Sequence, residues 1–193
     1  TAVNLAACLA ASGEKVLLVD IDPQGNATTG VGAVKSELGH CIYDVLINDE
    51  PLENVVVSTE TPGLDLVPAK LDLAGADIEL MSMMSREAKL KQALQRVSSR
   101  YGFVIIDCPP SLGLLTLNTM AAADSVLIPI QCEFYALEGL SQLLNTVRLV
   151  QRNLNPRLEI DGVLLTMFDQ RLNLSRQVAD EAKEYFGDRV FQT

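Results

Sequence analysis

Two apolar segments of the chain end in aspartate. VLLVDID runs from Val16 to Asp22 and carries its acids at Asp20 and Asp22, and FVIID ends at Asp107. Because the carboxyl ends of parallel strands meet at one edge of a sheet, we expect these three aspartates to converge there. Carboxylates at such an edge can hold Mg²⁺ through its retained waters, or orient an attacking water. Each aspartate could instead simply cap a following helix or turn.

The sequence around these acids lacks a phosphate cradle. No G-x-x-x-x-G-K-[ST] motif, the loop that binds phosphates between a strand and a helix, occurs in the 193 residues. Gly30-Val31-Gly32 has suitable residue types, but no helical pattern follows it closely, so we interpret it as a flexible loop. The chain starts inside a predicted helix at Thr1 and stops at Thr193 as a strand begins, so we expect both ends to be cut.

Strand and helix patterns alternate along the chain. Apolar runs without polar alternation predict strands covered on both faces, at residues 16–20, 64–68, 103–107, 125–130 and 158–166. Predicted helices cover 2–11, 43–47, 71–81, 86–99, 137–153 and 177–186, and another begins near 114. This order predicts an α/β fold with a mostly parallel, doubly wound sheet and helices on both faces, as one domain over residues 1–193.

Composition points to an ordinary cytoplasmic protein. Hydrophobic residues make up 48% of the chain and aromatic residues 5%, with no Trp, which is typical of the aliphatic interior of parallel sheets. No apolar run approaches the length of a membrane span, and no signal peptide is visible. The four cysteines are far apart in the sequence, which predicts reduced thiols and a cytoplasmic location.

Charge is distributed unevenly along the chain. The formal net charge of −10 argues against a generally basic nucleic-acid-binding protein. Residues 1–144 contain 8 basic and 18 acidic side chains, whereas residues 145–193 contain 7 of each. An anionic partner would therefore dock more favourably on the last quarter of the chain, although ordinary solvated helix faces would give the same balance.

Four stretches of the sequence carry longer motifs: TAVNLAACLA, VLLVDIDPQGNATTG, FVIIDCPPSLGLLTLNTMAAADSVLIPIQCEFYALEGLSQLLNTV and GVLLTMFDQR. Together they resemble the ParA/Soj chromosome-partitioning ATPases. In that family the first helix directly follows a deviant P-loop, K-G-G-V-G-K-T-T, so Thr1 would come just after it. The resemblance implies a P-loop NTPase-like fold that uses ATP and Mg²⁺, with a strand and the P-loop before Thr1 and a further C-terminal segment.

The resemblance also assigns roles to the three aspartates and to the loop that directly follows Asp22. It implies that Asp107 is the acid beside Mg²⁺ and that Asp22 positions the attacking water, with Asp20 beside it. The adjoining loop would sense the γ-phosphate and meet a second subunit, so that the protein forms a homodimer on binding ATP. The residues of that loop are Pro23, Gln24, Gly25 and Asn26.

A DNA contact is implied at the other end of the chain. Arg171, in FDQRLNLSR, matches a DNA-contacting position of Soj-like proteins, and Arg176 lies close by. The family binds DNA without sequence preference, works with a centromere-binding ParB-type protein and is associated with the nucleoid. Such binding depends on phosphate contacts from a local basic patch, so a negative total charge does not exclude it. A solvated loop arginine is the alternative interpretation.

Two other functions remain open from the sequence. A MinD-like ATPase would act at a membrane surface through a C-terminal amphipathic helix, and a non-catalytic fragment or adaptor would lack the P-loop altogether. The P-loop lysines, the Mg²⁺-binding threonine and the later Pro-Arg-Asn segment of the family are absent from these 193 residues. We therefore expect the chain alone to be inactive and assign ATP hydrolysis to the parent protein.

Overall fold

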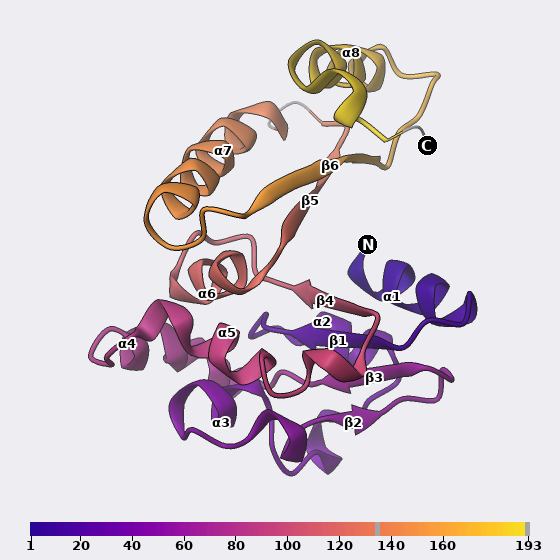
Figure 1. Ribbon diagram of the computed structural model, residues 1–193. Coiled ribbons are helices and arrows are strands. Elements are labelled where there is room, and N and C mark those ends of the chain that lie inside the picture. Colours follow the sequence, from indigo (N-terminus) through magenta and orange to yellow (C-terminus); the bar gives the residue numbers. More distant parts are fainter. Residues whose placement is uncertain (134–135, 192–193) are drawn as a thin grey trace. The chain divides into compact units, whose positions relative to one another are not determined.

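The computed structural model describes residues 1–133 and 136–191 (Figure 1). The chain divides into two compact units, Thr1–Ala122 and Ala123–Thr193. We describe each unit by itself, and a single domain over the whole chain stays a prediction.

The first unit is built on a four-stranded sheet. Its strands are β1 (Val16–Asp20), β2 (Val57–Ser58), β3 (Leu64–Val67) and β4 (Phe103–Asp107), in the order β2-β3-β1-β4. Strand β1 pairs in parallel with both β3 and β4, and only the short β2 is antiparallel in this sheet. The predicted α/β fold with a mostly parallel sheet is therefore confirmed.

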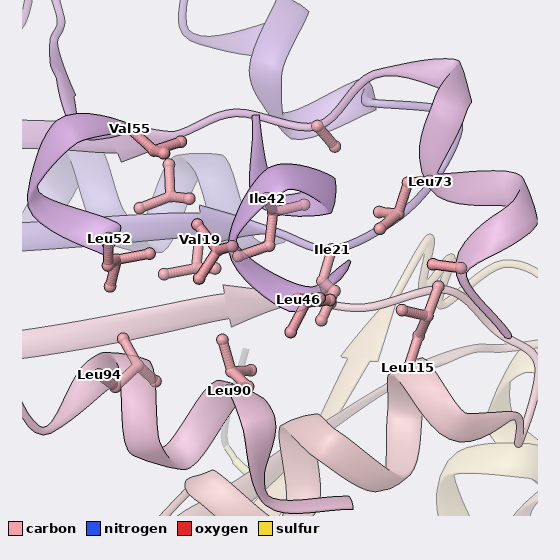
Figure 2. Packing of buried hydrophobic residues seen from close by; sticks show 14 of the residues in the cluster. Val19, Ile21, Ile42, Leu46, Leu52, Val55, Leu73, Leu90, Leu94 and Leu115 are labelled. Atoms are coloured by element: carbon pink, nitrogen blue, oxygen red, sulfur yellow. The ribbon is translucent and has the colours of Figure 1, made fainter. Parts of the chain in front are cut away.

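Strand β1 is covered on both of its faces. Its five residues are all buried, as the unbroken apolar run predicts. Leu17 and Val19 pack into one apolar cluster, whereas Val16 and Leu18 pack into another, because successive side chains of a strand point to opposite faces. Figure 2 shows the first cluster, in which Val19 lies among residues from the surrounding helices. By contrast β4, at the edge of this sheet, is only partly buried.

Short helices surround the sheet of the first unit. They are α1 (Ala2–Ala11), α2 (Asn26–Gly30), α3 (Ile42–Ile47), α4 (Ala76–Leu80), α5 (Lys89–Leu94) and α6 (Leu114–Ala122). Ala6 and Ala10 of α1 join the cluster around Val16. Helices α3, α5 and α6 contribute to the opposite cluster, so helices cover both faces, as predicted.

Two predicted helices are shorter and more broken than expected. The segment 71–81 forms a 3₁₀ turn over Leu71–Gly75 before α4, and the segment 86–99 forms two 3₁₀ turns around α5. Gly75 and the serines at 98 and 99 are weak helix formers, so short turns replace continuous helix at these points. At Asn26 the error is the reverse: the sequence predicted a loop there, but Asn26 begins helix α2.

The second unit contains two parallel strands and two helices. They are β5 (Ser125–Gln131), α7 (Ala136–Asn153), β6 (Glu159–Thr166) and α8 (Asn173–Phe186). An apolar cluster that includes Ile128, Val163 and Val178 joins β5, β6 and α8. The extended segment predicted from Val190 forms a parallel bridge with Val163, and residues 192–193 lie outside the described part. Among the helices described, none has the length and apolar character needed to cross a membrane.

Candidate functional site

Parallel pairing brings two of the predicted acids to adjacent positions at the end of the sheet. Asp20 is the register partner of Asp107 across β1 and β4. The next residue of the chain continues this pairing, because the N–H of Ile21 donates to the Asp107 carbonyl at 2.8 Å. Asp22 follows directly. The carboxyl ends of β1 and β4 therefore bring together acids from two strands that are far apart in the sequence.

Asp20 is fully buried, and its carboxylate accepts hydrogen bonds from neighbouring protein groups. Its Oδ1 accepts a hydrogen bond from the N–H of Asp22 at 3.1 Å. Its Oδ2 accepts the N–H and the hydroxyl of Thr28, each at 2.7 Å. Burial raises the pKa of Asp20, although these hydrogen bonds act in the opposite direction. Because protein donors occupy both oxygens, Asp20 organises the turn between β1 and α2.

Thr28 extends this arrangement to the neighbouring strand. Its hydroxyl oxygen accepts the N–H of Ala69 at 2.9 Å, just beyond the end of β3. The ends of β1 and β3 and the start of α2 are thus joined by one buried threonine. Sequence reasoning missed Thr28, since its partners lie 8 and 41 residues away and no local pattern marks it.

The loop that leaves β1 is a tight turn centred on Gln24. Oδ1 of Asp22 accepts the N–H of Gln24 at 2.9 Å, and the carbonyl of Asp22 accepts the N–H of Gly25 at 2.8 Å. Gly25 has φ +59° and ψ +39°, a left-handed conformation that favours glycine. Asn26 then begins α2. The turn therefore fixes one oxygen of the Asp22 carboxylate.

We expect Gly25→Ala to lower the free energy of unfolding by about 1–2 kcal/mol. A Cβ at this position would lie 3.0 Å from the Ala69 carbonyl oxygen and 2.5 Å from Cε of Lys35, in addition to the left-handed strain. Gly32→Ala is the matched control, because Gly32 has φ +88° and nothing within 4 Å of its added Cβ. Urea unfolding of both variants checks this expectation, and a smaller loss for Gly25→Ala than for Gly32→Ala would contradict the close approach.

Gly30 also departs from its predicted place in a flexible loop. It is the last residue of α2, and a Cβ there would lie 3.1 Å from a methyl group of Val3 in α1. The glycine therefore allows α1 and α2 to pack closely. Gly32 follows the helix in a turn.

Asp107 is partly buried, and its surroundings disfavour its ionised form. Burial raises the pKa of Asp107, and the charges of Asp20 and Asp22 raise it further. The three acids therefore repel one another in this arrangement. A divalent cation at this edge would relieve the repulsion.

The acids do not form a complete metal cage. Within the part of the chain that the structure describes, no group of three or more His, Cys, Asp or Glu side chains could hold a metal ion together. Mg²⁺ usually keeps several waters and binds one or two carboxylates plus substrate phosphates. The carboxylate of Asp107 is a ligand of the kind that such a site uses.

The segment after Asp107 is held by residues that the sequence patterns did not mark. Oδ1 of Asp77, in α4, accepts the N–H of Leu115 at 3.1 Å and so caps the start of α6 from another helix. The hydroxyl of Thr116 donates to the carbonyl of Ser111. These contacts anchor the loop that leads from Asp107 to α6.

The two predicted DNA-binding arginines lie in the second unit. The side chain of Arg171 is 89% exposed and forms a bidentate ion pair with Asp169, with Nε–Oδ1 at 3.0 Å and Nη2–Oδ2 at 2.7 Å. Arg176, in the first turn of α8, donates to Oδ1 of Asn173. Both arginines are exposed. A phosphate would compete with Asp169 for the guanidinium of Arg171.

Comparison with known proteins gives consistent matches over the chain. A family model described as an AAA domain matches residues 1–160. The sporulation initiation inhibitor protein Soj of Bacillus subtilis is 58% identical over 193 residues, which cover all of this chain and 76% of Soj. The chromosome partitioning protein ParA of Myxococcus xanthus is 53% identical over 192 residues and is covered to 68%.

A solved structure also matches closely. Cobyrinic acid a,c-diamide synthase from Mycobacterium smegmatis, crystallised with an ATP analogue and magnesium, is 40% identical with a TM-score of 0.89. The match covers 96% of this chain and 75% of that one. The fold described here is therefore one that holds a nucleotide and magnesium in that relative.

Proposed function

Because this chain belongs to the ParA/Soj family of chromosome-partitioning ATPases, we propose that its parent protein is an ATP-dependent switch that dimerises, binds DNA without sequence preference and hydrolyses ATP. The observation that carries this proposal is the register of Asp20 with Asp107 on adjacent parallel strands, followed at once by Asp22. The relative crystallised with an ATP analogue and magnesium supports the same nucleotide and metal here.

In this proposal Asp107 holds Mg²⁺ and Asp22 orients the attacking water. When bound, Mg²⁺ neutralises charge on the phosphate oxygens. Gln24 fixes Oδ1 of Asp22, whereas no protein donor occupies Oδ2 within residues 1–133 and 136–191. That oxygen is available to accept a hydrogen bond from the attacking water and to orient it. Asp20 contributes indirectly, by holding the N–H of Asp22.

The loop of Pro23, Gln24, Gly25 and Asn26 is our proposed contact with the γ-phosphate and the second subunit. Gln24 and Asn26 are exposed, and Gly25 lets the chain turn sharply between them. The base of the loop is fixed by Asp20 and Thr28. A contact made at the exposed tip would therefore shift the Asp22 carboxylate, because the N–H of Gln24 donates to it.

Turnover by the full-length protein tests the function directly. We expect Mg²⁺-dependent release of phosphate from ATP and an ATP-dependent shift from monomer to dimer in size-exclusion chromatography. Absence of ATP binding would favour an adaptor. ATP-dependent flotation with anionic vesicles, in place of DNA binding, would favour a MinD-like membrane-surface ATPase.

DNA binding is proposed for the loop and helix start that carry Arg171 and Arg176. The exposure of both side chains supports a phosphate contact, which needs no base-specific geometry. A centromere-binding ParB-type partner and a location on the nucleoid in the cytoplasm complete the proposal, in line with the chromosome-partitioning relatives.

We expect Arg171→Ala to weaken the binding of unrelated DNA sequences to a similar degree and to reduce the salt slope by roughly one counterion. Asp169→Asn should act in the opposite direction, because it releases the guanidinium from its ion pair. Fluorescence anisotropy at several salt concentrations, with ATP present, measures both effects. Identical affinities and slopes for both variants and the wild type would return Arg171 to the role of a solvated loop residue.

A further inference from the structure

The side chain of Lys35 contacts the loop of residues 23–26, which we call the catalytic loop, from a later segment of the chain. The residue begins the 3₁₀ turn Lys35–Glu37, which follows α2 in the chain. Its ammonium donates a hydrogen bond to the carbonyl oxygen of Gln24. Its stem lies against Gly25, since a Cβ on that glycine would come within 2.6 Å of Nζ and 2.5 Å of Cε. No local sequence pattern links these residues.

The backbone of Gln24 is consequently held at both of its polar groups. Its N–H donates to Oδ1 of Asp22, and its carbonyl accepts from Lys35. Rotation of the Gln24 backbone would therefore break one contact or both. The position of the Asp22 carboxylate is tied to the position of the Lys35 ammonium through this single residue.

The segment that carries Lys35 is anchored in turn. Lys70, just beyond β3, donates to the carbonyls of Leu38 and Gly39. Its neighbour Ala69 donates to the hydroxyl of Thr28, which itself holds Asp20. Hydrogen bonds therefore connect Asp20 to the catalytic loop, the loop to Lys35, and the segment after Lys35 to the end of β3. The end of β3 is connected to Asp20 in turn, through Thr28.

We propose that Lys35 is a positioning residue for ATP hydrolysis, which orients Asp22 by clamping the Gln24 carbonyl. This inference rests on the proposed function, in which Asp22 orients the attacking water. Lys35 contacts the loop through the Gln24 carbonyl. Because the placement of Asp22 depends on this loop, the loss of Lys35 should slow the chemical step more than it weakens nucleotide binding. A 1 Å displacement of a catalytic group can cost on the order of 100-fold in rate.

The test compares Lys35→Met, Lys35→Arg and Lys91→Met in the full-length protein. Methionine keeps the length of the apolar stem and removes the ammonium, arginine keeps a cationic donor, and Lys91 lies on α5. For Lys35→Met we expect amide hydrogen exchange in residues 22–28 to rise by roughly tenfold. We also expect kcat for ATP to fall by roughly tenfold, with a smaller change in KM.

The remaining variants separate positioning from general stability. Lys35→Arg should recover most of kcat, and Lys91→Met should match the wild type in exchange and in turnover. Unchanged exchange in residues 22–28 of Lys35→Met would overturn the proposal, and so would faster exchange with wild-type kcat. A wild-type protein without turnover would instead overturn the proposed function, while the exchange data would still decide whether Lys35 holds the loop.

Discussion

Asp22→Ala should lower the turnover of ATP by the full-length protein at least 100-fold, since a positioned acid–base group contributes about 10²–10⁴-fold. The substitution removes the carboxylate that orients water, but it removes no donor to phosphate, so ATP affinity should stay within about twofold of the wild type. Single-turnover phosphate release and titration with a fluorescent ATP analogue measure the two quantities.

A matched acid controls for loss of charge. Asp72 lies exposed in the 3₁₀ turn Leu71–Gly75 and has no role in the proposed mechanism, so Asp72→Ala should leave both quantities unchanged. ATP-dependent dimers should accumulate in Asp22→Ala, because hydrolysis no longer resolves them. Wild-type turnover in Asp22→Ala would remove this residue from the mechanism.

Asp107→Asn should abolish Mg²⁺-dependent turnover and, at the same time, make the nucleotide-free protein more stable at neutral pH. Burial raises the pKa of Asp107, and the charges of its acidic neighbours add to this, so the folded state disfavours the ionised carboxylate. Asparagine has a similar shape and carries no charge. The gain in the free energy of unfolding should be on the order of 1 kcal/mol for each pKa unit of the shift that is relieved.

The dependence on pH identifies the cause of that gain. A raised pKa in the folded state means that the folded protein binds the proton more tightly than the unfolded chain does. The contribution of Asp107 to wild-type stability therefore falls as the pH rises from 3.8, the ordinary pKa, through the raised pKa of Asp107. The advantage of Asp107→Asn should grow over the same interval and then level off, as thermal unfolding at a series of pH values would reveal. An advantage independent of pH would contradict this explanation.

The apolar runs of the sequence predicted three strands of the first unit, β1, β3 and β4, but not the two-residue strand β2. β1 and β4 have the predicted bounds because each is an unbroken apolar segment that ends in aspartate, and this pattern depends on neighbouring residues alone. Helix α1 was equally clear, since its alanines and leucines end near Gly13, which has φ +99°.

Helix α2 and the contacts around it could not be predicted in the same way. Asn26–Gly30 contains few strong helix formers, and its first turn is stabilised by the buried carboxylate of Asp20 on the preceding strand. Asp77 and Lys35 likewise act on residues that are distant in the sequence. Periodicity reports which face of an element is buried, but it does not report which side chain reaches across to another element.

The central place of β1 also constrains when the first unit can fold. Its hydrogen-bonding partners are β3 and β4, so the ribosome must add residues as far as Asp107 before β1 has a neighbour on each side. Pairing between segments so distant forms slowly. Until then the nascent chain exposes VLLV, an uncharged segment of the kind that pairs with its counterpart in other chains. Translation that pauses before Asp107 therefore leaves β1, all of whose residues are buried in the folded unit, open to aggregation and to chaperones.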